Sequence, residues 1–202
     1  PNLQLQDVVA IGKDTVMVVA SSAFSVAAAS RTSNIIRSIN NGASWQVIGG
    51  FPVGSTAPTL SKIFFTSNTV GYVSGNRGAV YKTTNGGTTW TNISPFPALN
   101  ATMNYTEIFA LDNNTVFVTG NGFPRKVVYK SVNGGTTWTD ITNNLATLPV
   151  GNLNAILMHD ENNGYVATPG VMVSTNNGGA TWNLEVPPTG NIFETMAFAP
   201  KT

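Results

Sequence analysis

The sequence predicts an all-β fold, a β-propeller made of four-stranded antiparallel blades. One octapeptide recurs four times and ends each time in a tryptophan. The copies read SINNGASW, TTNGGTTW, SVNGGTTW and TNNGGATW, and they end at Trp45, Trp90, Trp138 and Trp182, which lie 45, 48 and 44 residues apart. A repeat of this length, with turn residues at a fixed place, is the sequence pattern of propeller blades.

Each repeat also contains four short segments that favour strands. The first segments begin at Val8, Leu60, Tyr105 and Leu153, the second at Thr15, Thr69, Thr115 and Gly164, and the third at Asn34, Ala79, Val127 and Val171. The fourth segments begin at or just before the tryptophans. All are alternating or β-branched and are separated by clusters of turn residues, so each repeat predicts one antiparallel sheet and no helix is required.

The repeats predict a single propeller with blades at about residues 1–49, 50–94, 95–142 and 143–187, and with a further blade starting at 188–202. The last segment repeats the first strand of a blade, with Phe193, Met196 and Phe198 as its apolar positions. A ring that ends on one unpaired strand exposes a sheet edge. We therefore expect the remaining blades to come from other parts of a longer polypeptide or from another chain.

Composition excludes several classes of partner. Charged residues make up 9% of the 202 residues, with a net charge of +1, against about 25% in typical soluble domains. Without a run of Lys or Arg, neither nucleic acid nor an anionic membrane surface is expected as a partner. No apolar run reaches 18 residues, so membrane insertion is not expected either. Low charge with abundant Asn and Thr favours an extracellular, cell-surface or virion location.

The strand order places the loops on two sides of the predicted propeller. One side carries the short polar turns and all four octapeptides. The other side carries the loops between second and third strands and the links between blades, which differ from repeat to repeat. Because loops on a rigid scaffold often carry function, this variable-loop side is the candidate binding side.

The octapeptide resembles the Asp-box, or BNR repeat, of β-propellers in sialidases, sortilin-type receptors and Ycf48-related photosystem assembly factors. In that family the box forms the hairpin between the third and fourth strands of a blade. The acidic position of the motif is asparagine in every copy: Asn40, Asn85, Asn133 and Asn177. An asparagine oxygen still accepts hydrogen bonds within its own turn, but it brings no charge. We therefore expect a structural role for these asparagines and for the four tryptophans, and no metal or cofactor.

The candidate binding residues lie on the variable-loop side. Arg31, Arg77 and Arg125 each fall in a loop between the second and third strands, where they suit an anionic sugar or a carboxylate. Phe51, Phe96 and Phe123 suit an apolar contact patch, with the alternative that they cover the ends of the sheets. Arg37, by contrast, is expected to be a solvated strand residue.

No catalytic residue is assigned. Sialidases of the family use three arginines, a tyrosine–glutamate pair and an acid, and the motif F/Y-R-I-P near their first strand is absent here. Glu107 and Glu194 lie in first strands, where an acid can point into the expected central channel, but Glu107 shows no evident partner at its level in the other repeats. The lone His159 is expected to be structural.

The predicted function is therefore that of a non-catalytic interaction or scaffold module. Its variable-loop face would hold a protein or a glycan, or join the chain to others in a larger assembly. Two alternatives remain open, part of a sialidase-like glycoside hydrolase and a photosystem-assembly propeller, because one fold serves all three.

Overall fold

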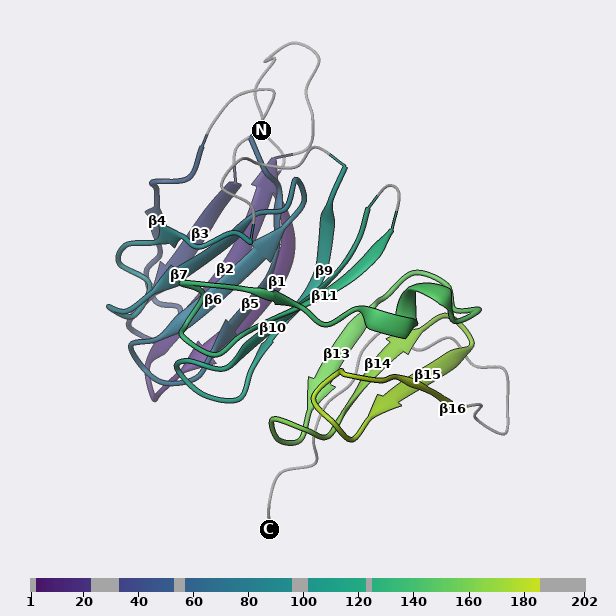
Figure 1. Cartoon of the computed structure of the whole chain (residues 1–202). Helices are drawn as coiled ribbons and strands as arrows, with labels where there is room; N and C mark the ends of the chain where they lie inside the picture. The colour runs from purple at the N-terminus through teal and green to yellow at the C-terminus, as the bar shows by residue number, and fades with distance from the viewer. Residues whose placement is uncertain (1–2, 23–32, 53–56, 96–101, 123–124, 186–202) are drawn as a thin grey trace.

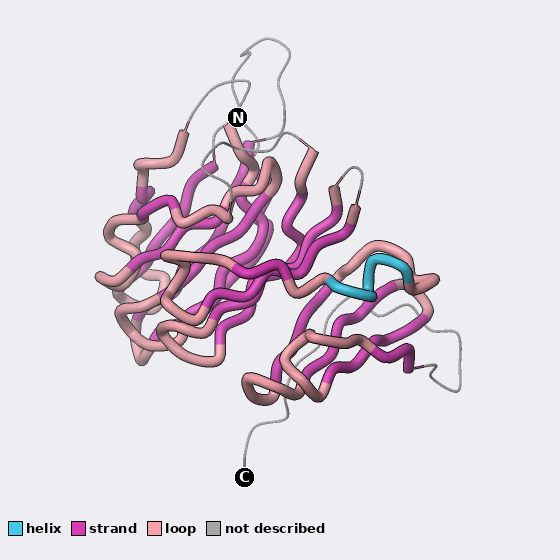
Figure 2. Tube along the Cα trace, in the orientation of Figure 1, coloured by secondary structure: helices cyan, strands magenta, loops and turns pink. Residues whose placement is uncertain are grey.

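The computed structural model describes residues 3–22, 33–52, 57–95, 102–122 and 125–185. These ranges form four four-stranded antiparallel sheets, and in every sheet the strands follow one another in chain order. Figure 1 and Figure 2 show the sheets succeeding each other along the chain, with loops making up most of the remainder. The predicted all-β class and the four-stranded sheets are confirmed.

We refer to the sheets as blades 1 to 4. Blade 1 contains β1 (Leu3–Ile11), β2 (Thr15–Ser22), β3 (Ser33–Ser38) and β4 (Gln46–Ile48). Blade 2 contains β5 (Leu60–Phe65), β6 (Gly71–Gly75), β7 (Val80–Thr83) and β8 (Thr91–Asn92). Blade 3 contains β9 (Asn104–Ala110), β10 (Val116–Asn121), β11 (Lys126–Ser131) and β12 (Thr139–Asp140). Blade 4 contains β13 (Ala155–Met158), β14 (Gly164–Thr168), β15 (Val171–Thr175) and β16 (Asn183–Glu185).

One short helix departs from the prediction that no helix is needed. The 3-10 helix η1 (Asn143–Thr147) lies in the link between blades 3 and 4. Its Leu145 is fully buried in the core that also holds Ile141 and Trp182. The side chain of Asn144 pairs with both the N–H and the C=O of Trp182, at 2.8 Å each. The link thus packs against the next blade, which its polar sequence did not reveal. Across the described ranges, no helix is long and apolar enough to cross a membrane.

The hydrophobic core lies between consecutive blades. The first cluster combines Met17, Val19 and Ile35 of blade 1 with Ile63 and Val73 of blade 2. Two similar clusters join blade 2 to blade 3 and blade 3 to blade 4. Each sheet buries apolar side chains on a face that touches its neighbour, so the blades stabilise one another by removing apolar surface from water.

No blade among the described residues covers one apolar face of blade 1. Leu5 is 68% exposed, Val8 62% and Trp45 49%. The residues at the same positions of blade 2, Leu60 and Ile63, are at most 6% exposed because blade 1 covers them. Leu5, Val18, Ile36 and Trp45 line an apolar hollow of about 290 Å³ on this open face.

Candidate functional site

The loops of the variable side are anchored by polar contacts to the next blade. The hydroxyl of Ser33 donates to Pro58 O at 2.8 Å and accepts from Leu60 N at 3.0 Å. The amide side chain of Asn121 brackets Leu153, accepting from its N–H at 2.8 Å and donating to its C=O at 2.9 Å. These hydrogen bonds fix the chain at the start of the first strand of blade 2 and of blade 4. We call the first strands of the four blades, β1, β5, β9 and β13, the inner strands.

Arg77 lies at the tip of the hairpin between β6 and β7. The hairpin is closed by a hydrogen bond from Ala79 N to Asn76 O, and Arg77 and Gly78 both have positive φ, at 59° and 72°. Two consecutive residues of this kind make a tight turn whose twist suits a hairpin, but the left-handed region is unfavourable for arginine. The Nε of Arg77 is buried and has no hydrogen-bond partner among the residues that the structure describes. The side chain is half-buried beside the start of blade 3, whose Met103 O accepts from Gly78 N at 3.0 Å.

Arg125 lies at the start of β11, and its guanidinium pairs with Asp140 of β12. The Nη2–Oδ2 distance is 2.6 Å, and the two side chains are 53% and 29% exposed. The other oxygen of Asp140 accepts from Thr142 N at 2.9 Å and from the Thr142 hydroxyl at 2.5 Å. A carboxylate fixed in this way orients the guanidinium of Arg125, and the Arg125 side chain as a whole stays about half-exposed.

Phe51 is the one predicted aromatic binding residue that the structure describes, and it lies in the core. Phe51 is only 7% exposed, with its ring edge-on to Tyr81 at 5.1 Å and tilted against Trp90 at 6.3 Å. Its burial favours the alternative expectation, that it covers the end of a sheet. Arg31, Phe96 and Phe123 lie outside the described residues. Of the predicted binding residues that the structure describes, Arg77 and Arg125 keep part of their side chains exposed on the variable-loop side.

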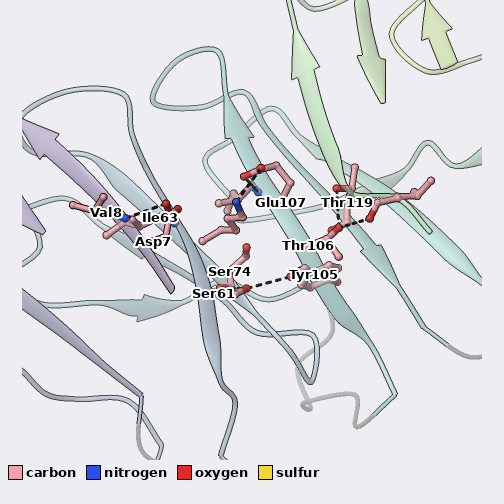
Figure 3. Close-up of polar contacts among 12 residues, drawn as sticks. Asp7, Val8, Ser61, Ile63, Ser74, Tyr105, Thr106, Glu107 and Thr119 are labelled. Atoms are coloured by element: carbon pink, nitrogen blue, oxygen red, sulfur yellow. Dashed lines mark hydrogen bonds and ion pairs between the residues drawn. The ribbon is translucent and has the colours of Figure 1, made fainter. Parts of the chain in front are cut away.

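A second polar cluster lies on the inner strands. β1, β5 and β9 each carry a bulge at the same place, where Gln6, Ser61 and Thr106 fall out of register with the neighbouring strand. The residue after each bulge is charged, and Lys62 Nζ lies 3.7 Å from Glu107 Oε2. The third is Asp7, whose Oδ2 crosses to blade 2 and accepts from Ile63 N at 3.0 Å. Figure 3 shows Asp7 and Glu107 on their separate strands.

This cluster corrects the expectation that Glu107 has no partner at its level. Bulges re-aim side chains, and here the three bulges bring Asp7, Lys62 and Glu107 to equivalent positions in blades 1 to 3, while blade 4 has Ala155 there. The segments LQDV, LSKI and YTEI do carry the signal, but it emerges only when the inner strands are aligned with one another.

Three of the four carboxylate oxygens of the cluster accept main-chain hydrogen bonds, and the fourth, Glu107 Oε2, faces Lys62 Nζ at 3.7 Å in an ion pair. Asp7 Oδ1 accepts from Val8 N at 3.0 Å, and Glu107 Oε1 accepts from Ile108 N at 3.1 Å. Burial raises the pKa of Glu107, opposed by Lys62 and the Ile108 N–H and assisted by the negative charge of Asp7. The hydroxyl of Thr106 donates to Leu153 O at 2.7 Å. These groups tie neighbouring inner strands together.

The octapeptide turns share one hydrogen-bond pattern. In each copy the asparagine Oδ1 accepts from the N–H four residues later, at 2.9–3.0 Å, and Nδ2 donates to the hydroxyl of that residue, at 2.8–2.9 Å. The pairs are Asn40–Ser44, Asn85–Thr89, Asn133–Thr137 and Asn177–Thr181. The amide therefore uses its nitrogen where an ionised carboxylate would have a second acceptor.

The tryptophans differ in their surroundings according to what precedes their blade. The indole N–H of Trp138 donates to Ile93 O at 2.7 Å, and that of Trp182 to Ile141 O at 2.9 Å. Both acceptors belong to the preceding blade. Trp182 is 1% exposed, whereas Trp45, on the open face of blade 1, is 49% exposed. Trp90 donates instead to Gly87 O of its own turn, at 3.2 Å, but its ring packs against the cluster between blades 1 and 2. In blades 2 to 4 the tryptophan ring thus lies at the contact with the preceding blade.

Arg37 was expected to be a solvated strand residue, but its side chain contacts the next blade. Its Nη1 donates to the hydroxyl of Thr88 in the octapeptide of blade 2, at 3.1 Å. Lys82 and Lys130, at the same position of later blades, donate to Asn113 O and Glu161 O of the following blade, at 3.2 Å each. A basic side chain of each third strand therefore reaches across to the next blade.

Comparison of the sequence with models of protein families agrees with the four repeated four-stranded sheets. A family model described as "Photosynthesis system II assembly factor YCF48" matches residues 38–198. The chain belongs to this family. Among curated proteins, none matches it.

Solved structures show the same fold. YCF48 bound to D1 peptide superposes with a TM-score of 0.69 at 18% identity, over 98% of this chain and 58% of that one. YCF48 from Cyanidioschyzon merolae gives 0.62 at 16% identity, over 92% and 57%. The GH74 xyloglucanase from Xanthomonas campestris gives 0.62 at 18% identity, over 82% and 26%. This chain therefore spans a little over half the length of the YCF48 chains.

Membership of the YCF48 family corrects two expectations. The predicted extracellular, cell-surface or virion location is wrong, because the family is one of photosystem II assembly factors. Among the predicted functions, the photosystem-assembly alternative is supported better than the extracellular scaffold. A glycan partner finds no support, and the likeness to a xyloglucanase at this identity shows the fold alone.

Proposed function

We propose that this chain acts in photosystem II assembly by holding an extended segment of a photosystem protein on its variable-loop side. The observation that carries the proposal is the family match over residues 38–198. The solved YCF48 bound to D1 peptide supports a peptide as the ligand class. We extend that ligand class to this chain by family membership, since 18% identity transfers no binding residue.

Arg77 and Arg125 are the residues we assign to the bound segment. The Nε of Arg77 is buried and pairs with none of the described residues, while the side chain as a whole is only half-buried. We assign its terminal nitrogens to a carboxylate or a main-chain carbonyl of the ligand. Arg125 is already oriented by Asp140 and stays half-exposed. Both groups offer several N–H donors in a fixed plane, which suits carboxylates and carbonyls of an extended peptide.

The test is binding of a D1 peptide to the purified protein, followed by fluorescence anisotropy. The double variant Arg77→Gln/Arg125→Gln should bind about tenfold more weakly, since exposed charges contribute up to about 1 kcal/mol each. Lys13→Gln is the control, because it removes a charge from an exposed turn between β1 and β2, on the opposite side. Unchanged affinity of the double variant would reject these residues, and no binding by the wild type would reject the peptide as ligand.

We further propose that the octapeptides are Asp-box turns in which asparagine replaces the acid. The shared bonds of Asn85 to Thr89 N and to the Thr89 hydroxyl support this. A carboxylate would accept both hydrogens, since the hydroxyl can turn its own proton toward it. Asn85→Asp should leave the free energy of unfolding within about 0.5 kcal/mol, whereas Asn85→Leu should lower it by about 2 kcal/mol by leaving the turn N–H unpaired. Equal losses in urea titrations would reject the assignment.

We also propose that the open face of blade 1 packs against another blade in the complete propeller. The exposed positions Leu5, Val8 and Trp45 are those that a preceding blade covers in blades 2 to 4. Hydroxyl-radical footprinting of the complete propeller, rather than of the 202-residue chain by itself, tests it. Trp45 should be protected to the level of Trp182, and labelling well above that level would show that the face stays open.

A further inference from the structure

We infer that Asn41 is a modification site, the asparagine at which the folded protein deamidates without an enzyme. The main-chain nitrogen of Gly42 attacks the side-chain carbonyl carbon of Asn41, forming a new C–N bond. The bond from that carbon to Nδ2 breaks, and ammonia leaves with the proton of the Gly42 N–H. Water then opens the five-membered imide to aspartate or isoaspartate. The overall change consumes one water and releases one ammonia, and it is independent of the proposed function.

The chain has six Asn–Gly pairs, which provide internal comparisons. Glycine favours the reaction because, with no Cβ, it leaves the attacking nitrogen unhindered and its backbone free to move. Four of the pairs lie in the octapeptides. In the three later copies the reacting asparagine would be the box residue, whereas in the first copy it is the residue after it. The pairs begin at Asn41, Asn85, Asn121, Asn133, Asn163 and Asn177.

The three later box asparagines each make three side-chain hydrogen bonds, and the nitrogen that would attack them is hydrogen-bonded as well. Asn85 Oδ1 accepts from the Thr83 hydroxyl at 3.0 Å and from Thr89 N at 3.0 Å, while Nδ2 donates to Thr89 at 2.8 Å. The attacking nitrogen, that of Gly86, donates to Thr69 O at 2.9 Å. Asn133 and Asn177 repeat this pattern. Imide formation there must break all three side-chain bonds as well as the main-chain one.

Asn41 occupies a different place in the same turn. It stands in the left-handed position, with φ 55°, where the other three copies have glycine with φ of 64–67°. Among the described residues its exposed side chain makes one hydrogen bond, from Nδ2 to Asp14 Oδ1 at 3.0 Å. The nitrogen of Gly42 donates only to the Ser38 hydroxyl, at 2.8 Å. Two fewer side-chain bonds oppose the reaction at Asn41 than at the box asparagines.

The remaining two pairs are also more firmly held than Asn41. Asn121 brackets both main-chain groups of Leu153 with its amide. Asn163 is exposed, but its Nδ2 reaches both oxygens of Asp160, at 3.0 and 2.8 Å. Its neighbour Gly164 is fixed within β14, between β13 and β15. Asn41 is therefore the least constrained of the six.

Deamidation would change the polar-turn side of blade 1. It converts the donor that Asn41 offers to Asp14 into a second carboxylate, so two negative groups face each other across a former hydrogen bond. The main-chain bond from Asn41 N to Asp14 O, at 3.0 Å, then remains as the tie between this hairpin tip and the first turn. We expect the deamidated protein to have a lower melting temperature than the unmodified protein.

The experiment is timed incubation of the native protein at mildly alkaline pH, with each site quantified by mass spectrometry of proteolytic fragments. Asn41 should react at least about tenfold faster than Asn85, Asn133 and Asn177, the factor that one hydrogen bond of typical net strength gives. In concentrated urea the rates should converge, since every pair is then free. Equal rates in the native protein, or a box asparagine reacting first, would overturn the inference.

Asn41→Gly is the matched control. It gives the first copy the glycine of the others and places Asn40 directly before a glycine, so the number of Asn–Gly pairs is unchanged. Asn40 carries the box bonds to Ser38 and Ser44, and its reaction should be as slow as that of Asn85. A rate at Asn40 equal to that of Asn41 in the wild type would show that these bonds give no protection.

Discussion

Replacing each tryptophan by phenylalanine, one at a time, should reveal how the blades depend on their neighbours. The substitution is the same in every blade and removes the indole N–H and part of the ring. At Trp182 it takes away a donor to Ile141 O, at 2.9 Å, in a fully buried setting. At Trp45 it acts on a side chain that is 49% exposed. The series therefore compares one chemical change in two environments.

The expected losses follow from burial. An unpaired buried carbonyl costs about 1–3 kcal/mol, and the space left by the smaller ring adds to this because the core relaxes only in part. Trp182→Phe should therefore lower the free energy of unfolding by about 2–4 kcal/mol. Measured on the 202-residue chain by itself, in which Trp45 is 49% exposed, Trp45→Phe should change the free energy of unfolding by no more than about 0.5 kcal/mol, as for other surface substitutions.

Urea unfolding followed by circular dichroism measures both variants without relying on tryptophan fluorescence. Coincidence with a second probe checks that unfolding is cooperative, which repeat proteins do not always satisfy. A loss at Trp45 equal to that at Trp182 would refute the reasoning, because it would mean that contact with a preceding blade does not set the contribution of the tryptophan. So would a Trp182→Phe variant as stable as the wild type.

Three further substitutions test the ties between and within blades. Arg77→Gly should raise the free energy of unfolding by about 1 kcal/mol, since φ of 59° is unfavourable for arginine, and a thermal melt no higher than wild type would contradict this. Asn121→Ala should lower it by about 2 kcal/mol by leaving Leu153 N and O unpaired, with the inner strand of blade 4 showing faster amide exchange. Glu107→Gln should gain stability relative to the wild type as the pH rises. The pKa of Glu107 is raised in the folded protein, so its favourable contribution to the free energy of unfolding is complete in acid and is lost as the pH passes the folded pKa. Parallel curves of stability against pH for the two proteins would contradict this.

The sequence predicts the strands well because their pattern is local and is repeated. Alternating and β-branched segments flanked by Asn and Gly turns define the sheets without reference to anything distant. The hydroxyl and amide partners of the box asparagine also lie within four residues, so the turn chemistry could be anticipated. The one missed element, η1, is held by contacts with Trp182, 38 residues from Asn144, and no local signal reports a partner so far along the chain.

The candidate site is less predictable because its residues meet through packing. Phe51 and Arg77 both fall on the variable-loop side, yet one ring is buried against Tyr81 and Trp90 while the other side chain stays half-exposed. Composition cannot separate these outcomes, since both depend on where the neighbouring blade lies.

The inner cluster shows how a repeat can carry more information than its individual copies. Asp7, Lys62 and Glu107 are unremarkable one at a time, and a search for paired acids misses them because the middle residue is basic. Their common feature is a bulge that shifts the register by one residue in three successive inner strands. A bulge turns the following side chain toward the strand edge, where unpaired N–H groups need acceptors. Asp7 and Glu107 supply those acceptors at Ile63 and Ile108, and Lys62 offsets one of the two charges. The same alignment that reveals the bulges therefore explains the charges, as a means of closing the exposed edges of inner strands.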